Sequence, residues 1–435
     1  MTNEPWVEGP GADAETFVRR NLRRNYVAHA IDGGLYIGAL AFVSATTVLP
    51  TMVQNLGGPD WLITLVPVLL SVGFLGMPIF TAHYIDRMSR YKRMLITTGV
   101  FQRAPYLIAG LVILYVATTN ATIALAALAL APLVSGAVCG LSQTGWQQLL
   151  ARTIPENRRS SVFALRYAIA CVIGIGAGAA VKAILSAYPG ATGYGLLHLC
   201  TAAGLVISLG IFSTIREPVI PPPAAHKPRT LGENLRAVPD LLRSEPGLAR
   251  YLVAGAFMNG IFILIPFLAI RAQQSLGRSE SYLGDLVMAQ MAGAILGNLL
   301  AGFLGDRFGG KLVMILSQVV FAAMAAWSVL AASDAEFRAI FVLFGFSFFA
   351  FQVGASTLNI ELCPLRHRST YLAIISLLNM PTMVAATVVS ALVWHSGDRF
   401  AWIAGLAIAC VLVSLAILAG VREPRTAAVR PTGEL

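Results

Sequence analysis

Charged residues are scarce in this chain of 435 residues: only 12% are charged, whereas 57% are hydrophobic. Soluble domains carry about 25% charged residues, so this composition excludes an ordinary soluble domain. A Walker-type phosphate loop is missing, which argues against direct use of ATP. A nucleophile elbow and metal-ligand spacings are missing as well. We therefore expect no enzyme activity, no metal and no cofactor.

Cysteine is rare too, and the start of the chain does not resemble a signal peptide. Several acidic residues precede the first apolar run, which is not the pattern of a secretory leader. The five cysteines fall in or at the ends of apolar runs without metal-ligand spacing; they are Cys139, Cys171, Cys200, Cys363 and Cys410. We expect them to be packing residues that form no disulfide.

Long apolar runs dominate the rest of the chain. A bilayer span needs about 20 consecutive, mostly apolar residues. Twelve runs qualify, at 26–49, 61–83, 94–117, 121–148, 161–186, 192–214, 251–270, 283–305, 312–332, 336–358, 370–394 and 400–420. They do not alternate in short units as barrel strands would, so they predict helices. The predicted fold class is an all-α polytopic membrane protein with 12 transmembrane helices.

The distribution of lysine and arginine predicts the orientation. Most of the 31 basic residues fall at the termini and in the loops on their side; the opposite side receives only Lys182, Arg271, Arg278, Arg338 and Arg399. Since basic loops mark the cytoplasmic side, both termini should be cytoplasmic, in the inner or plasma membrane. The net charge of +10 then reflects topology and attraction to membrane lipids, and we expect no nucleic-acid partner.

Two sequence echoes divide the apolar region into halves. The string AHYIDR at residues 82–87 returns as GFLGDR at residues 302–307, and both close a long apolar run before a short basic turn. In addition, Gln143, Pro155, Arg159 and Ser160 return as Gln352, Pro364, Arg368 and Ser369. Two joined half-proteins, each hydrophobic throughout and each with charged signatures at equivalent turns, indicate a transporter.

The one long polar interruption separates these halves. It contains three consecutive prolines at 221–223 and several basic residues, which predict an extended linker, and residues 231–245 could form a short interfacial helix. The predicted organisation is a cytoplasmic arm (1–25), a six-helix bundle (26–215), a cytoplasmic linker (216–249), a second six-helix bundle (250–421) and a cytoplasmic tail (422–435). The bundles would be parallel, pseudo-symmetric repeats.

At this point a family resemblance becomes specific. The string GFLGDRFGGK at residues 302–311 resembles the signature turn of the major facilitator superfamily, and the likeness covers almost the whole chain. The first copy is degraded, because Ala82 and Ser89 replace glycines, although Asp86, Arg87 and Arg90 remain. The resemblance implies the family's fold and transport by alternating access.

The resemblance also implies a cytoplasmic gate. In the family, the signature turn of one half faces the start of a helix in the other half, which here places Asp306 near Arg159 and Asp86 near Arg368. A helix start attracts carboxylates, and glycines such as Gly302 leave room for close helix approach. We interpret these residues, with Arg307 and Lys311, as a latch that holds one state. The alternative is a solvated loop that only sets topology.

Ionisable residues inside a span usually mark function. Asp32 is the one acid well inside an apolar run, and His29 and Tyr36 share its helix face at i−3 and i+4. Burial of a carboxylate favours its neutral form, which is what a proton-coupling site requires. Asn259 lies at about the matching place in span seven, and the family resemblance implies that both spans line a central cavity. The alternative for Asp32 is a structural ion pair.

Two arginines lie within spans. Arg166 enters span five at about the depth of Asp32, so we expect it to pair with Asp32, to bind an anionic substrate, or to reach the headgroups. Arg103 lies in span three, which is usually peripheral in the family, so structural pairing is the preferred reading.

Amides add further polar positions. Gln143 and Gln147 in span four, Gln352 in span ten and Asn379 in span eleven are candidates for substrate contact or for helix–helix hydrogen bonds. The glycine-rich stretch at 174–178 looks like a bending or close-packing site.

Together these observations predict a secondary active transporter for a small organic solute, with an anionic solute favoured and proton coupling expected. We expect it to act as a monomer. The alternatives are an uncoupled facilitator, a drug or lipid exporter, and a transporter-like receptor that does not transport.

Overall fold

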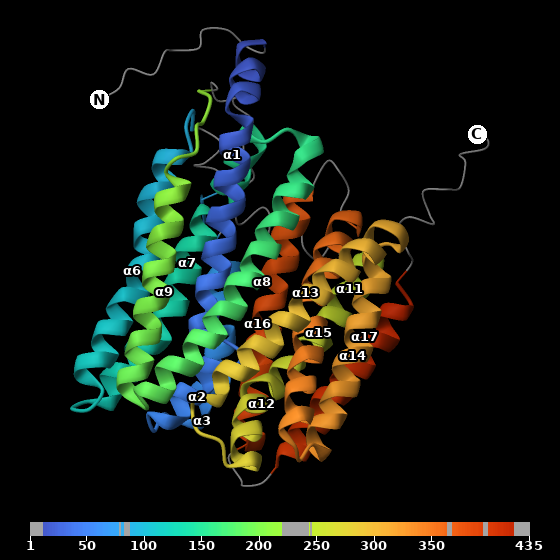
Figure 1. Cartoon of the computed structure of the whole chain (residues 1–435). Coiled ribbons are helices and arrows are strands. Elements are labelled where there is room, and N and C mark those ends of the chain that lie inside the picture. Colours follow the sequence, from blue (N-terminus) through green and yellow to red (C-terminus); the bar gives the residue numbers. More distant parts are fainter. Residues whose placement is uncertain are drawn as a thin grey trace. The chain divides into compact units, whose positions relative to one another are not determined.

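The computed structural model describes residues 12–77, 80–81, 88–219, 243, 246–362, 368–394 and 399–421. Throughout these residues the regular structure is helical (Figure 1). Eleven of the described helices are long and apolar enough to cross a membrane, and the shorter apolar segment Asp60–Gly76 stands in the place of the second predicted span. The predicted all-α fold with twelve spans is thereby confirmed.

The helices follow the predicted runs closely. Those of the first half are α1 (Ala12–Ala39), α2 (Val48–Asn55), α3 (Asp60–Leu65), α4 (Leu69–Gly76), α6 (Lys92–Val116), α7 (Ala121–Thr153), α8 (Glu156–Ala187) and α9 (Ala191–Phe212), with 3-10 turns η1 (Leu40–Val43) and η2 (Val66–Val68). Those of the second half are α11 (Pro246–Met258), α12 (Ile261–Leu276), α13 (Tyr282–Phe308), α14 (Gly310–Leu330), α15 (Asp334–Leu362), α16 (Arg368–Trp394) and α17 (Phe400–Ala419).

Some predicted boundaries need correction. The arm at 1–25 is not separate from the first span, because α1 begins at Ala12 and continues into it. Its arginines are good helix formers, and the following apolar run extends the same helix. The interfacial helix predicted at 231–245 lies almost entirely outside the described residues.

Three spans are interrupted rather than straight. Span one breaks at η1, span two at η2, and span seven at Asn259-Gly260 between α11 and α12. Pro67 within η2 has no backbone N–H to donate, and Gly260 is a poor helix former, so both favour a local break. Breaks of this kind bring polar backbone groups to membrane depth.

Packing divides the chain into two compact units. Unit 1 contains residues 1–43, 69–174 and 194–229; unit 2 contains residues 44–68, 175–193 and 230–435. Unit 2 therefore combines the whole second half with two segments of the first half. This division by packing does not follow the sequence halves.

The same close helix crossing occurs in each unit. In unit 1, a Cβ on Gly136 of α7 would overlap the backbone of Leu70 in α4. In unit 2, a Cβ on Gly345 of α15 would overlap the backbone of Gln290 in α13. Each crossing joins the second and fourth spans of its half. Only glycine permits backbones to approach this closely, so both halves use the same packing device.

Candidate transport site

Asp32 lies on α1 inside unit 1 and is only 5% exposed. The Ser208 hydroxyl of α9 donates a hydrogen bond of 2.6 Å to its Oδ1 atom. The nearest cation in the described structure is Arg103 of α6, whose Nη2 atom lies 3.9 Å from the same oxygen. Arg103 rather than Arg166 is therefore in ion-pair contact with Asp32 in this structure, and the charge of Arg166 also acts on Asp32. Sequence position gives depth in the membrane but not which helix face a side chain meets.

Backbone groups fix the Arg103 side chain. Its Nε atom donates to the Leu205 carbonyl at 2.7 Å, and Nη1 donates to the Gly99 carbonyl at 3.0 Å. Nη1 also donates to Gln102 Oε1 at 3.3 Å, and Nη2 donates to the Ser208 hydroxyl at 3.2 Å. Every guanidinium nitrogen of this buried residue thus has an acceptor. Such a side chain has little capacity left for a ligand.

Tyr36 belongs to the same network, whereas His29 does not. Gln102 Nε2 donates to the Tyr36 hydroxyl at 2.7 Å, and the Arg103 guanidinium carbon lies 5.5 Å from the Tyr36 ring centre. His29 Nε2 instead lies 3.0 Å from the Thr153 hydroxyl, and its buried Nδ1 has no hydrogen-bond partner among the described residues. The predicted trio on α1 is therefore divided between two environments.

Arg166 of α8 is placed quite differently from Arg103. Its guanidinium lies directly over Gly33 of α1, so that a Cβ on Gly33 would overlap it. Its guanidinium carbon is 4.9 Å from the centre of the Trp146 ring. No described residue accepts a hydrogen bond from Arg166, although a guanidinium offers five N–H donors. Arg166 thus lies beside Asp32 with its donors available for a carboxylate.

The predicted glutamines surround this region only in part. Gln143 is half-buried and Gln147 is exposed on α7, on either side of Trp146 in sequence. The Trp146 ring meets Phe163 edge to face at 6.0 Å between centres. Gln352 is exposed on α15 of unit 2. Among the described residues, none of the three glutamine side chains makes a hydrogen bond to another helix.

Two predicted residues of the second half lie together. Asn259, at the break between α11 and α12, donates from Nδ2 to the Thr382 hydroxyl at 2.8 Å and to the Asn379 carbonyl at 3.3 Å. Thr382 and Asn379 belong to α16. The interruption of span seven thus places a half-buried polar group against the proline-containing part of span eleven.

The predicted gate is described only in part. Asp86 and Arg87 lie outside the described residues, as does the side chain of Arg368. The side chains of Arg90, Asp306 and Arg307 are exposed. The latch contacts between the two halves therefore stay a prediction.

Three other gate residues have a local environment that the structure describes. Arg159 donates to the carbonyls of Ile154 and Ala151, at 3.1 and 2.9 Å, and so caps the end of α7. Lys311 donates to the carbonyls of Ala419 and Val421, at 3.0 and 2.6 Å, and so caps α17. Gly302 has no described atom within 4 Å of the position of a Cβ. Among the described residues, therefore, no neighbouring helix lies close to Gly302, and the close approach stays a prediction.

Sequence reasoning missed two residues that hold the first signature turn. Glu217 accepts hydrogen bonds from the backbone N–H groups of Tyr91 and Lys92, at 2.8 and 2.9 Å, and so caps the start of α6. Arg152 donates to the Ser89 carbonyl at 2.9 Å and to the Tyr91 hydroxyl at 3.0 Å. The sequence did contain a signal for Glu217. The string REP occurs after the last span of each half, at 216–218 and 422–424.

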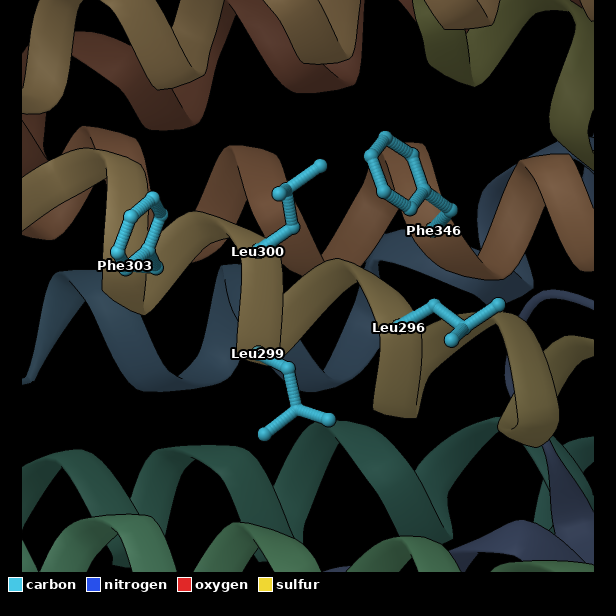
Figure 2. A pocket seen from close by; sticks show the side chains of 5 residues that line it. All are labelled: Leu296, Leu299, Leu300, Phe303 and Phe346. Atoms are coloured by element: carbon cyan, nitrogen blue, oxygen red, sulfur yellow. The ribbon is translucent and has the colours of Figure 1, made fainter.

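A shallow apolar groove on unit 2 has a different character. It is lined by Leu296, Leu299, Leu300 and Phe303 of α13 and by Phe346 of α15 (Figure 2). The groove presents no charged or hydrogen-bonding side chain. An apolar surface of this kind is ordinary on a helix that faces lipid, so the groove does not add to the polar candidate site.

Comparison with known proteins agrees with this fold. The Major Facilitator Superfamily model matches residues 251–434. A nucleoside transporter, NupG, has a similar structure with a TM-score of 0.70 at 14% identity, covering 90% of this chain and 99% of that one. A D-xylose–proton symporter gives 0.66 at 15% identity, covering 93% and 99%. Identities this low show a shared fold and nothing finer. The family match is confined to the second half of the chain, and the similar structures share the fold of the whole chain.

One similar protein of known function matches locally in sequence. The 4-hydroxybenzoate transporter PcaK of Acinetobacter baylyi is 36% identical over 117 residues, which is 26% of this chain. The match spans only about a quarter of that transporter's length.

Proposed function

We propose that this protein is a secondary active transporter that carries a small organic anion by alternating access and couples its movement to protons. The observation that carries the proposal is the contrast between the two membrane-embedded arginines of unit 1. Arg103 is saturated by four acceptors, whereas Arg166 has none among the described residues. An arginine cannot give up its proton in a protein, so the second charge needs a partner, and a substrate carboxylate supplies one.

The surroundings of Arg166 favour a planar substrate. The Trp146 ring lies against the guanidinium, and its edge-to-face partner Phe163 extends the aromatic surface. A carboxylate bound to Arg166 would hold an attached aromatic ring near these side chains. The local likeness to a 4-hydroxybenzoate transporter points to the same chemistry. The proposed substrate class is therefore small carboxylic acids, with aromatic acids first.

Asp32 is the proposed proton site. It is a buried acid on a membrane-spanning helix of unit 1, and its counter-ion Arg103 remains charged whatever the state of Asp32. Protonation of Asp32 would weaken its attraction to Arg103 and change the field at Arg166, whose guanidinium lies over the next residue of α1. Binding of a proton and binding of an anion would then influence each other.

Uptake by purified protein in proteoliposomes tests the proposal. The expected result is that an inward proton gradient accumulates labelled 4-hydroxybenzoate or another carboxylic acid from a panel. Arg166→Gln should abolish saturable uptake, and Arg166→Lys should raise KM by about tenfold, because a point charge replaces bidentate hydrogen bonding. Arg158→Lys, an exposed change on the same helix, is the matched control.

The proton step is tested separately by exchange. Asp32→Asn should lose accumulation driven by the gradient but retain exchange of labelled for unlabelled substrate. If uptake does not depend on pH and is unchanged in Asp32→Asn, the protein is an uncoupled facilitator and proton coupling is rejected.

A further inference from the structure

A second charged cluster lies in unit 2, away from the arginines of the transport site. Lys182 of α8 reaches Asp285 of α13, with its Nζ atom 3.0 and 3.1 Å from the two carboxylate oxygens. Arg338 of α15 approaches the same carboxylate at 3.5 Å and also pairs with Asp334 at 2.9 Å. We call these four residues the lock cluster. Asp285 therefore has two cations, one from each half of the sequence.

The side chains of the lock cluster differ in how far they are exposed. The side chain of Asp285 is 7% exposed, whereas those of Lys182 and Arg338 are 49% and 47% exposed. A buried carboxylate without a cation is costly, because its desolvation is then uncompensated. Half-exposed cations can be rehydrated when they leave. The carboxylate is thus the fixed member of the cluster, and the cations are the members that can exchange.

Close backbone contact accompanies the pair. A Cβ on Gly178, one helical turn before Lys182, would come within 2.9 Å of the Gly284 carbonyl and the Met288 backbone nitrogen. A Cβ on Gly284, the neighbour of Asp285, would overlap the backbone of α8 in turn. The helices α8 and α13 therefore touch through their backbones at Gly284, which directly precedes the ion-paired Asp285. Any separation of these two helices must break the pair.

Other polar contacts join the same two halves within unit 2. Thr47 donates to Gln290 Oε1 at 2.6 Å, and Gln290 Nε2 donates to Thr46 at 3.1 Å. Glu280 accepts from the Gly190 N–H and from Asn55 Nδ2, each at 2.8 Å. Apart from Gln290, which lies two turns inside α13, these residues are at the span ends that the distribution of basic residues predicts to be outside. We call this set of contacts the outer gate; it is closed in this structure.

The geometry points to a reversible lock on the outer gate, in which Lys182 binds Asp285 while the gate is closed and Arg338 keeps Asp285 compensated while it is open. Arg338 and Asp285 belong to the same half, on α15 and α13, which pack closely along each other. Opening would therefore remove Lys182 from the carboxylate but leave Arg338 in place. The lock is independent of the transported substrate, so its failure would leave the proposed function standing.

The model makes predictions of opposite sign for the two cations. Lys182→Met removes the bond between halves but leaves Asp285 with Arg338, so the open-gate population should rise. Arg338→Gln leaves Asp285 dependent on Lys182 alone, so opening would strand a buried carboxylate and the open-gate population should fall. A pair of ordinary stabilising salt bridges would not give opposite signs.

Pulsed electron paramagnetic resonance measures this population directly. Spin labels on Tyr188→Cys at the end of α8 and Gln274→Cys near the end of α12, both exposed positions, report the distance across the outer gate. The protein is reconstituted in nanodiscs after replacement of its five native cysteines. We expect the ratio of long to short distances to rise about two- to fivefold for Lys182→Met, the range for a partly exposed ion pair. It should fall by a similar factor for Arg338→Gln.

Controls separate the lock from general perturbation. Arg278→Gln, a change of an exposed basic residue on the same predicted face, should leave the ratio unchanged. In an Asp285→Asn background, neither Lys182→Met nor Arg338→Gln should shift the ratio, because the carboxylate that couples them is gone. If Arg338→Gln alone fails to fold, the Asp285→Asn background still allows the two cation variants to be compared. Shifts of the same sign in both single variants, or unchanged ratios, would overturn the lock.

Discussion

Asp32 and Asp285 are two buried carboxylates with opposite kinds of partner. Asp32 faces Arg103, which is 7% exposed and bound to the carbonyls of Leu205 and Gly99. Asp285 faces Lys182 and Arg338, which are both about half exposed. The first cation is part of the helix packing of unit 1, while the other two extend from water to the carboxylate.

This difference in the exposure of the cations indicates which ion pair can separate during transport. Removing one partner of a buried pair costs about 3–5 kcal/mol, because the remaining charge is left uncompensated. A pair with an exposed member is worth about 0.2–1 kcal/mol, which is small enough to break and reform during a transport cycle. Arg103 is therefore suited to stay in place while Asp32 gains or loses a proton, and the Asp285 pair is suited to separate and reform.

Removal of Arg103 should give the largest effect. Arg103→Leu leaves Asp32 buried without its cation and leaves the Ser208 hydroxyl and two carbonyls without a donor, so the free energy of unfolding should fall by about 3–5 kcal/mol. Denaturation of the purified protein in mixed micelles measures this. Adding Asp32→Leu should restore part of the loss. A wild-type stability for Arg103→Leu would contradict the contrast drawn above.

An intermediate effect is expected at Gly33, and it is on transport rather than on folding. Gly33→Ala places a methyl group where the Arg166 guanidinium lies, so KM for the carboxylate should rise by about tenfold, equivalent to the loss of one charged hydrogen bond. Gly176→Ala on α8 is the matched control, because no described atom lies within 4 Å of the added carbon. Equal KM values in the two variants would remove Arg166 from the substrate site.

The smallest effect is expected from Lys182. Because its side chain is half exposed, Lys182→Met should lower the free energy of unfolding by less than about 1 kcal/mol, in the same micelle titration. A loss as large as that of Arg103→Leu would mean that the lock cluster is structural, and the distinction between the two carboxylates would disappear.

Much of the fold could be predicted because each continuous apolar run predicts its own helix without knowledge of packing. The twelve runs and the turn at residues 82–87 that returns at residues 302–307 all lie in continuous stretches. Asp32 and Asn259 were found because a polar residue in an apolar run is visible without any knowledge of packing. Sequence reasoning preferred structural pairing for Arg103 but could not name its partners or choose among the alternatives for Arg166, since only contacts with neighbouring helices decide these points.

By itself, the sequence determined that this protein is a bundle of membrane helices built from two related halves. In lipid each segment must satisfy its own backbone hydrogen bonds, so a long apolar run has little choice but to form a helix. Only the tertiary structure decided that Arg103 contacts Asp32, that Arg166 lies over Gly33 and beside Trp146, and that Lys182 reaches Asp285. Hydrophobicity does not choose neighbours among apolar helices; close fit at small residues such as Gly33, Gly178 and Gly284 does.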